Sequence, residues 1–399
     1  MSKPLPLDDL RVLDLTHYYN GPYATMLLAY LGARVIKIEE PEYGDGARAL
    51  YRREDQPFGI PFALMNANKR SITLNLKSEE GRALFKRMVA KADIVVENFA
   101  AGTMDALGLG WEILHALNPR LIYAFSTGYG SSGPDRHLPA FDPVVQANTG
   151  IMALTGAADG PPYKAGPPVV DILGATHLAA GILAAIRERD RTGEGMVVEL
   201  SLQESTLPSL ATHMGALGMG LGNLRDGNRS SGGFVVPYNA YRAKDGWVMI
   251  LAGDNRRWRR LCEVMGRPDV AADPRFHKLS GRQKYPDEID AIITAWTSQL
   301  TRAEIMELIG ANDLFGGMVK ELPEVIADPH LRARGTLRDV DHPELGPMTI
   351  FTSPIRLDRQ PTATPSPAPT LGEDNESVYA EEFGLTADEI AAMRARGTI

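Results

Sequence analysis

"RVLDLTHYYNGPYATMLLAYLGARVIKIEE", residues 11–40, decides the fold of this chain. The β-branched and leucine-rich runs at 11–16 and 34–40 predict two strands, and the apolar run at 21–33 predicts the helix that joins them. A strand, a helix and a second strand of these lengths form a βαβ unit, whose two strands lie parallel in one sheet.

The same alternation continues through the first half of the chain. Further strands are predicted at 70–76, 93–99, 120–130 and 197–205, and further helices at 78–92, 111–118 and 172–187. The fold class is therefore α/β with a parallel sheet. Ligands of such sheets bind at the carboxyl ends of the strands, which here are the segments THYYNGP (16–22), ENF (97–99) and STGYGSSGP (126–134).

A chain of 399 residues favours two domains, or one large domain that carries a smaller one. Residues 237–253 predict a β-hairpin with Asp245-Gly246 as its turn. Helices near 256–266, 286–299 and 302–311 follow the hairpin and form with it a second, smaller unit. The last predicted helix, 386–397, has Thr386 as its N-cap.

Composition and charge exclude several classes of function. The net charge of −8 argues against a general affinity for nucleic acid or for acidic membranes. The single cysteine, Cys262, excludes internal disulfides and cysteine-rich zinc sites and fits a reducing cytoplasm. The N-terminus lacks the layout of a signal peptide, and the apolar run 172–186 is too short to span a bilayer. The histidines show no metal-ligand spacing, so no metal is expected.

Motifs of common enzyme classes are missing. The sequence has no GxGxxG after a strand, no GxxxxGK[ST] and no GxSxG. Asp171 precedes a long apolar helix, and the residues alone leave two interpretations open: a helix cap, which is the commoner role, or a reacting carboxylate. Residues 230–233, SSGG, are likewise either a linker or a cradle of backbone amides for an oxyanion.

Taken together, many segments in order resemble the class III CoA-transferase family, which includes formyl-CoA transferases, carnitine CoA-transferases and α-methylacyl-CoA racemases. The resemblance runs almost from end to end. It covers the opening stretch, NANKRSITLNL (66–76), ADIVVENFAAGTMDALGLGW (92–111), NPRLIYAFSTGYGSSGP (118–134), FDPVVQANTGIMALTG (141–156), VVDILGATHLAAGILAAIRERDRTGEGMVVELSLQES (169–205), DPHLRARGTL (328–337) and LGED (371–374).

The resemblance implies a fold and an assembly. It predicts a large Rossmann-like CoA-binding domain at 1–224, a small α+β domain at 225–335 and a segment at 336–399 that returns to the large domain. It also implies an interlocked homodimer, in which two ring-like chains are threaded through each other.

The resemblance implies an activity as well. The chain is expected to be a CoA-transferase (EC 2.8.3 type), with an acyl-CoA and a small carboxylic acid as its substrates. Asp171 matches the family's nucleophile, which forms an aspartyl anhydride and then an aspartyl-CoA thioester. Gly232 and Gly233 match its glycine-rich catalytic loop. We expect Asp171 also to cap the helix at Ile172, whose dipole would hold the carboxylate ionised.

Contacts with coenzyme A are expected on matching segments. The candidates are Tyr18, Tyr19, Asn20, Leu74, Asn98 and Phe99, with Arg48 and Arg70 as phosphate or structural partners. Four positions that are basic in formyl-CoA transferase differ here, and these are Glu40, Ala100, Ala106 and Pro139. Their loss weakens the usual phosphate clamp, because charge-assisted contacts are the strong ones.

Two alternatives remain beside the transferase. A racemase needs an acid/base pair, and its histidine position is Phe141 here, followed by Asp142; His137 could replace it only if its loop folded inward. A CoA-binding homologue without turnover is the other alternative, and the retained Asp171 and Gly232-Gly233 argue against it.

Overall fold

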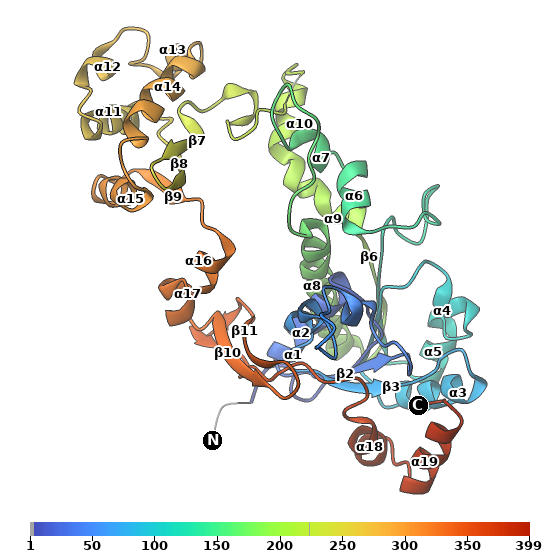
Figure 1. Cartoon of the computed structure of the whole chain (residues 1–399). Helices are drawn as coiled ribbons and strands as arrows, with labels where there is room; N and C mark the ends of the chain where they lie inside the picture. The colour runs from blue at the N-terminus through green and yellow to red at the C-terminus, as the bar shows by residue number, and fades with distance from the viewer. Residues whose placement is uncertain (1–3, 223) are drawn as a thin grey trace. The chain divides into compact units, whose positions relative to one another are not determined.

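The computed structural model describes residues 4–222 and 224–399 and divides them into two compact units (Figure 1). The first unit contains the chain up to Val145 together with Pro167–Thr206 and Ile326–Ile399. The second contains Gln146–Gly166 and Leu207–Val325. These limits differ from the boundaries expected at 224 and 335, because the chain crosses between the units more often than the resemblance implied.

A six-stranded parallel sheet forms the centre of the first unit. Its order is β3-β2-β1-β4-β5-β6, and each strand lies within its predicted range. The strands are β1 (Arg11–Asp14), β2 (Arg34–Glu39), β3 (Arg70–Thr73), β4 (Ile94–Glu97), β5 (Ile122–Thr127) and β6 (Val197–Ser201). The order reverses between β1 and β4, which is the place where ligands of doubly wound sheets bind. The predicted α/β class is confirmed.

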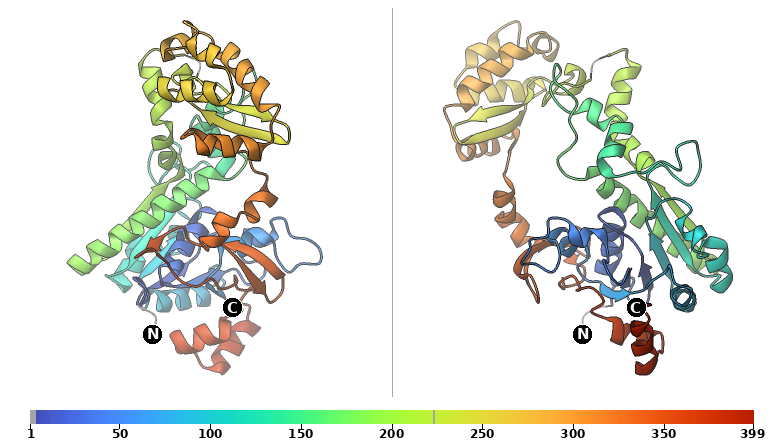
Figure 2. Two further views of the ribbon diagram at one scale, coloured as in Figure 1. Left: turned by 90° about the vertical axis from the view of Figure 1, so that its left-hand side faces the viewer. Right: turned by 45° about the vertical axis from the view of Figure 1, so that its right-hand side comes forward.

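Helices cover both faces of this sheet (Figure 2). One core joins the sheet to α1 (Asn20–Tyr30) and α8 (Val169–Thr192). The opposite core joins it to α3 (Glu79–Val89), α5 (Trp111–Leu117), η4 (Val378–Glu382) and α19 (Ala387–Ala395). Neighbouring residues of β1 show the division, since Val12 packs in the first core and Leu13 in the second. Both faces are apolar because both are covered.

Helix α8 is longer than predicted, 24 residues that begin at Val169 instead of Ile172. Its length and mean hydropathy of 1.9 would suffice to cross a membrane. Its small and apolar side chains at i, i+4 spacing are nevertheless buried in the first unit, and these are Val170, Gly174, Ala175, Leu178, Ala179, Ile182, Ala185 and Ile186. The helix packs along α1 and β5 and is a core helix of this unit.

The C-terminal segment of the chain closes the β3 edge of the sheet. Tyr379 donates its hydroxyl to the Thr73 carbonyl at 2.7 Å, and Asn375 exchanges two hydrogen bonds of 2.8 Å with Thr73. Asp374 N donates to Ser71 O at 2.9 Å. The N-cap predicted at Thr386 is confirmed, with Glu389 completing a capping box.

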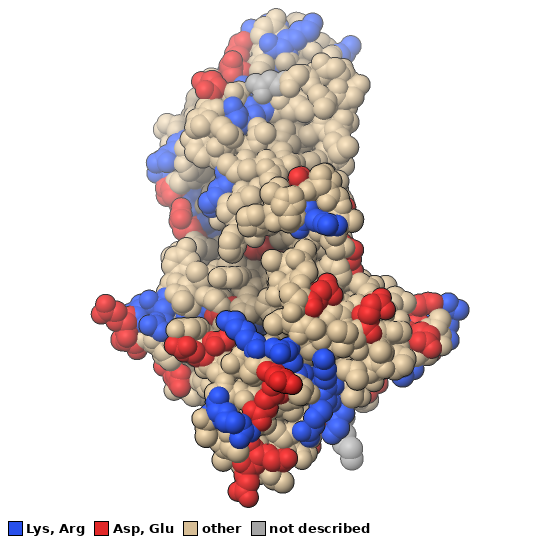
Figure 3. Space-filling view, turned by 90° about the vertical axis from the view of Figure 1, so that its right-hand side faces the viewer, with Lys and Arg blue, Asp and Glu red and all other residues tan. Residues whose placement is uncertain are grey.

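Shorter elements complete the first unit. They are η1 (Gly46–Ala49), α2 (Ile60–Met65), α4 (Thr103–Ala106), α9 (Leu202–Thr206), α17 (Pro329–Ala333), β10 (Leu337–His342), β11 (Gly346–Phe351), β12 (Arg356–Leu357), β13 (Gln360–Pro361) and α18 (Asn375–Ser377). Helix α16 (Leu322–Ile326) belongs to the second unit up to Val325. On the face drawn in Figure 3, acidic and basic side chains of the described residues lie among one another and not in separate areas.

The second unit is built on a three-stranded antiparallel sheet, β7 (Tyr238–Ala243), β8 (Gly246–Leu251) and β9 (Phe315–Met318). The predicted hairpin is present, but its turn is Lys244-Asp245, because Gly246 already pairs with Ala243. The helices are α6 (Asp142–Asn148, crossing from the first unit), α7 (Ile151–Leu154), η2 (Leu207–Leu210), α10 (Ala211–Gly218), η3 (Ser231–Gly233), α11 (Asn255–Val264), α12 (Pro268–Ala272), α13 (Leu279–Arg282), α14 (Pro286–Thr297) and α15 (Arg302–Ala311). Trp258 lies in its core.

The C-terminal closure gives a first prediction. Tyr379→Phe deletes the hydroxyl that satisfies the buried Thr73 carbonyl, so we expect the free energy of unfolding to fall by about 1–3 kcal/mol. Urea denaturation measures this loss. The exposed Tyr163 gives the matched control, since Tyr163→Phe should leave stability unchanged. Equal stability of the two variants would show that the hydroxyl contributes nothing.

Candidate active site

The two loops at the reversal of strand order are joined through one side chain. Asn98, directly after β4, accepts a hydrogen bond from His17 N at 2.8 Å and donates to His17 O at 2.9 Å. The Phe99 ring lies 5.7 Å from the His17 ring. The segments THYYNGP and ENF, both predicted as site segments, are therefore neighbours.

A network of buried charges lies beneath the first of these loops. Lys69 pairs with Asp14 at 2.9 Å, and Lys37 pairs with Asp45 at 2.9 Å. Burial acts to raise the pKa of Asp14, but the two lysines hold it well below its usual range. Burial also lowers the pKa of Lys69 to about 8, so its ammonium depends on this partner.

The same network shapes the turn that carries Tyr18. The backbone of Tyr18 is left-handed, with φ 66°, which is uncommon for a residue other than glycine. Its N–H donates to Asp45 Oδ1 at 3.0 Å, and Lys37 Nζ donates to Thr16 O at 2.7 Å. Both bonds fix the turn, so that Tyr18 is exposed and Asn20 is buried as the first residue of α1.

Arg48 and Arg70 are held by carboxylates of the protein itself. Arg48 forks onto Glu39 with two bonds of 2.7 Å, and its guanidinium carbon lies 3.6 Å from the centre of the Phe62 ring. Arg70 pairs with Asp374 at 2.9 Å and with Glu382 at 3.0 Å. Of the two roles predicted for these arginines, the structure shows the structural one.

The other predicted contact positions differ in how much they expose. Leu74 lies in the core, 2% exposed, so that only its backbone is within reach of a ligand. Glu40 accepts the backbone N–H groups of the turn that follows it. Ala100, Ala106 and Pro139 are exposed. The surface thus carries no basic side chain at Glu40, Ala100, Ala106 or Pro139.

Asp171 lies in the first turn of α8, and the expectation that it caps the helix is wrong. The helix begins at Val169, and the carboxylate that accepts its free N–H groups belongs to Asp142. Asp142 Oδ2 accepts from Val170 N at 2.8 Å and from Asp171 N at 3.2 Å. Asn20 Nδ2 donates to Asp171 O at 3.0 Å. Asp171 therefore meets the turn before α1 at the end of β1.

The expectation that the helix dipole holds Asp171 ionised is also not met. Burial, and then the negative charge of Asp142, raise the pKa of Asp171 to about 7. Burial, followed by the interactions with Tyr51 and Asp171, raises the pKa of Tyr19. The exposed Phe141 ring meets the Tyr18 ring edge-on at 5.9 Å, and His137 lies on the exposed segment 131–139. Neither supplies a base beside Asp171.

Two further buried carboxyl groups were not singled out from the sequence. Glu97, the last residue of β4, accepts from Phe99 N at 2.7 Å and Tyr123 OH at 3.1 Å. Burial raises the pKa of Glu97 to about 7. Asp142 directly follows Phe141 in the sequence. Its signal in the sequence is an Asp-Pro pair that opens a helix, which marks a carboxylate available for capping.

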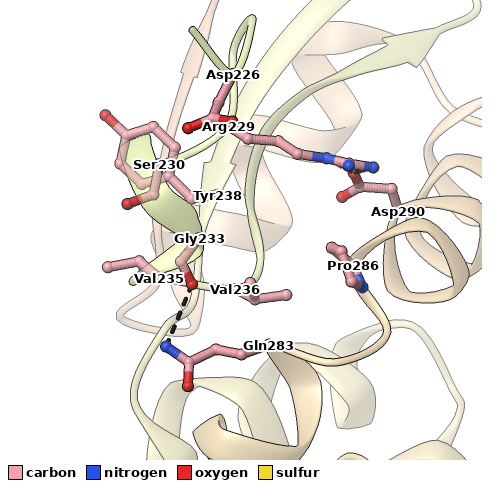
Figure 4. A pocket seen from close by; sticks show the side chains of 10 residues that line it. All are labelled: Asp226, Arg229, Ser230, Gly233, Val235, Val236, Tyr238, Gln283, Pro286 and Asp290. Atoms are coloured by element: carbon pink, nitrogen blue, oxygen red, sulfur yellow. Dashed lines mark hydrogen bonds and ion pairs between the residues drawn. The ribbon is translucent and has the colours of Figure 1, made fainter. Parts of the chain in front are cut away.

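The loop with Gly232 and Gly233 belongs to the second unit. Both glycines have positive φ, 66° and 67°, which suits glycine. Gly232 N donates to Asp226 Oδ2 at 2.7 Å, and Ser231 Oγ lies 2.8 Å from His213 Nε2. Figure 4 shows the pocket beside this loop, about 130 Å³, where Gln283 Nε2 donates to the Gly233 carbonyl at 3.2 Å. The loop is thus a fixed turn rather than a loose linker.

No group of three or more potential metal ligands occurs among residues 4–222 and 224–399.

Comparisons with known proteins cover nearly the whole chain. The profile of a family described as CoA-transferase family III matches residues 7–375. Succinyl-CoA–D-citramalate CoA-transferase of Chloroflexus aurantiacus is 36% identical over 397 residues, 99% of this chain and 98% of the relative. Acetyl-CoA:oxalate CoA-transferase of Acetobacter aceti is 39% identical over 334 residues, 83% of this chain and 85% of the relative. The crystal structure of a CAIB/BAIF family protein from Brucella suis superposes with a TM-score of 0.85 at 33% identity, covering 95% of this chain and 100% of that one.

The half-buried Asp171 gives a prediction for stability. Because folding raises its pKa, the folded state binds this proton more tightly, and the carboxyl group costs stability as the pH rises from about 4 to about 7. Asp171→Asn removes the cost, so the variant should be more stable than the parent at pH 8, by an amount on the order of 2–4 kcal/mol. Urea denaturation at pH 8 and pH 4.5 measures the difference.

At pH 4.5 the gain should have largely disappeared, because the parent carboxyl group is then protonated in the folded state. Asp159→Asn, at an exposed position, is the control and should show no such pH dependence. A gain that is equal at both pH values would contradict the raised pKa of Asp171.

Proposed function

The chain belongs to CoA-transferase family III, and from this premise we propose that it moves coenzyme A from an acyl-CoA to a carboxylic acid with Asp171 as the nucleophile. The observation that carries the proposal is the place of Asp171. Asp171 lies in the first turn of α8, and its backbone carbonyl accepts from Asn20 Nδ2 at 3.0 Å, which joins it to the loops at the reversal of strand order. Relatives named as CoA-transferases cover the chain around this residue.

The chemistry follows from a carboxylate nucleophile. Ionised Asp171 attacks the thioester carbonyl of the donor, a C–O bond forms, the C–S bond breaks, and the CoA thiolate leaves an acyl-aspartyl anhydride. The thiolate then attacks the Asp171 carbonyl carbon, which releases the donor acid and gives an aspartyl-CoA thioester. The acceptor carboxylate repeats the two steps in reverse. Its acyl-CoA leaves, and the Asp171 carboxylate is restored.

The residues around Asp171 fit a CoA thioester. Asn20 Oδ1 is buried and has no hydrogen-bond partner among the described residues, so it offers an acceptor for an amide N–H of the substrate next to the nucleophile. Tyr18, Tyr19, Asn98 and Phe99 border the same turn and are proposed contacts. The lack of basic side chains at Ala100 and Ala106 supports the proposal that affinity comes from such polar and aromatic contacts more than from phosphate clamps.

The catalytic role of Gly232 and Gly233 stays a prediction from the resemblance, because Gly232 N donates to Asp226 Oδ2 at 2.7 Å and Gly233 N to Ser230 O at 2.8 Å. The interlocked homodimer and the cytoplasmic location stay predictions.

The acceptor is proposed to be a small dicarboxylic acid. The relatives are named for citramalate, oxalate, mesaconate and malate, each of which carries two carboxylates. The racemase alternative finds no support at Phe141, which cannot carry a proton. A screen of acyl-CoA donors against dicarboxylate, hydroxy-acid and aromatic acceptors identifies the pair.

The mechanism predicts a covalent adduct. With an acyl-CoA and hydroxylamine, peptide mass spectrometry should find a hydroxamate at Asp171, because hydroxylamine attacks both the anhydride and the thioester. Asp171→Asn should give no adduct and lower CoA exchange by at least about 1000-fold, while keeping the fold. Asp159→Asn should exchange CoA as the parent does.

Two results would overturn the proposal. Exchange that persists in Asp171→Asn would exclude this nucleophile. Deuterium uptake at the α-carbon of the acyl group without an adduct would favour the racemase.

A further inference from the structure

We propose that Glu97 is a positioning residue for coenzyme A, which in its ionised form holds Asn98 and Phe99 where they contact the substrate. This inference rests on the proposed function, because Asn98 and Phe99 are contacts proposed there. Glu97 is the last residue of β4, next to the reversal of strand order, and belongs to the first unit. The transfer steps at Asp171 make no use of its carboxyl group.

The first step of the argument is the hydrogen bonding of Glu97. The residue is only 6% exposed, so water does not replace the partners of its carboxyl group. Oε2 accepts from Phe99 N at 2.7 Å, and Oε1 accepts from Tyr123 OH at 3.1 Å. Tyr123 is itself buried in the core that joins the sheet to α3 and α5. The carboxyl group therefore ties the backbone after β4 to the neighbouring strand β5.

The second step leads from this carboxyl group to the loop. The turn that begins at Glu97 and closes on Phe99 N encloses Asn98. Asn98 is thereby presented to His17, with which it exchanges hydrogen bonds of 2.8 and 2.9 Å. The Phe99 ring lies 5.7 Å from the His17 ring. Glu97 thus fixes the backbone from which both proposed contacts extend.

The third step is the protonation state of the carboxyl group. The ionisable groups that act on Glu97 are Tyr123 from β5 and Asp105 from α4, and neither is a cation. Burial raises the pKa of Glu97 to about 7, although the hydrogen bonds from Phe99 N and Tyr123 OH oppose the rise. Near neutral pH the loop is therefore held partly by a carboxylate and partly by a carboxylic acid. The carboxylate is the better acceptor, since charge-assisted hydrogen bonds are about twice as strong as neutral ones.

Linkage connects this protonation with binding. Because the carboxylate holds the loop more firmly, the ionised protein binds coenzyme A more tightly, and bound coenzyme A favours the carboxylate by the same factor. A difference in affinity of about tenfold makes binding release about half a proton from Glu97 near pH 6.5. The negative charge of coenzyme A, acting through space alone, would have the opposite sign and cause proton uptake.

The test is calorimetric titration of coenzyme A into the Asp171→Asn protein at pH 6.5, in two buffers of different ionisation enthalpy. The two heats give the number of protons released, and the substitution removes the other carboxyl group that titrates in this range. Glu97→Gln in the same background keeps an oxygen for Phe99 N but cannot ionise. We expect it to release about half a proton less and, at pH 8, to bind coenzyme A about 3- to 10-fold more weakly. The phosphates of coenzyme A titrate alike in both titrations, so the difference belongs to Glu97.

Two further variants accompany this titration. Tyr123→Phe removes one donor to the carboxylate, so the pH of greatest proton release should move up. Glu112→Gln, at an exposed position on α5, is the matched control and should release protons as the background protein does.

Activity supplies a second readout. With Asp171 intact, Glu97→Gln should raise the KM for the acyl-CoA about 3- to 10-fold at pH 8 and leave kcat within about twofold, because Glu97 acts on binding and not on the nucleophile. Proton release that is equal with and without Glu97, or an uptake that Glu97→Gln abolishes, would overturn the inference and leave the proposed function intact. A parent that binds coenzyme A with the expected release but exchanges none would exclude the proposed function and support the role of Glu97.

Discussion

The pairing of Lys69 with Asp14, both fully buried, is the interaction on which the first unit depends. Removing one partner of such a pair leaves an uncompensated charge in the interior and costs about 3–5 kcal/mol. The pair joins the end of β1 to the residue before β3, and the neighbouring pair of Lys37 and Asp45 joins β2 to the residue before η1. These two ion pairs fix the shape of the turn at 16–20.

From that turn the rest of the site follows in order. Tyr18 can keep its left-handed backbone only because Asp45 accepts its N–H, and Asn20 then enters α1 with its amide pointing at Asp171. The sheet order brings β4 beside β1, so that Asn98 closes the other side. The candidate nucleophile is thus held by contacts from distant parts of the chain, which is the rigid support that covalent catalysis requires.

Much of the fold, and less of the site, could be predicted from the sequence. Runs such as RVIKIEE are buried on both faces, so a few consecutive apolar and β-branched residues are enough to predict a strand. The strand β2 and its neighbours therefore lie where the sequence predicts them. The resemblance identified Asp171, but the start of α8 was placed three residues late, because the apolar spacing that predicts the helix begins at Ile172. Asp142 caps this helix, and Arg48 pairs with Glu39. Both are tertiary contacts, which the local sequence pattern does not predict.

The closure of the β3 edge by the C-terminal segment has a consequence during synthesis of the chain. The strand is complete once Thr73 has been made, yet its partners Asn375 and Tyr379 leave the ribosome about 15–60 s later at ordinary elongation rates. Throughout that interval one margin of the nascent sheet presents open backbone groups to other chains. We infer that nascent chains stalled before residue 375 are the species most exposed to off-pathway association and to chaperone capture.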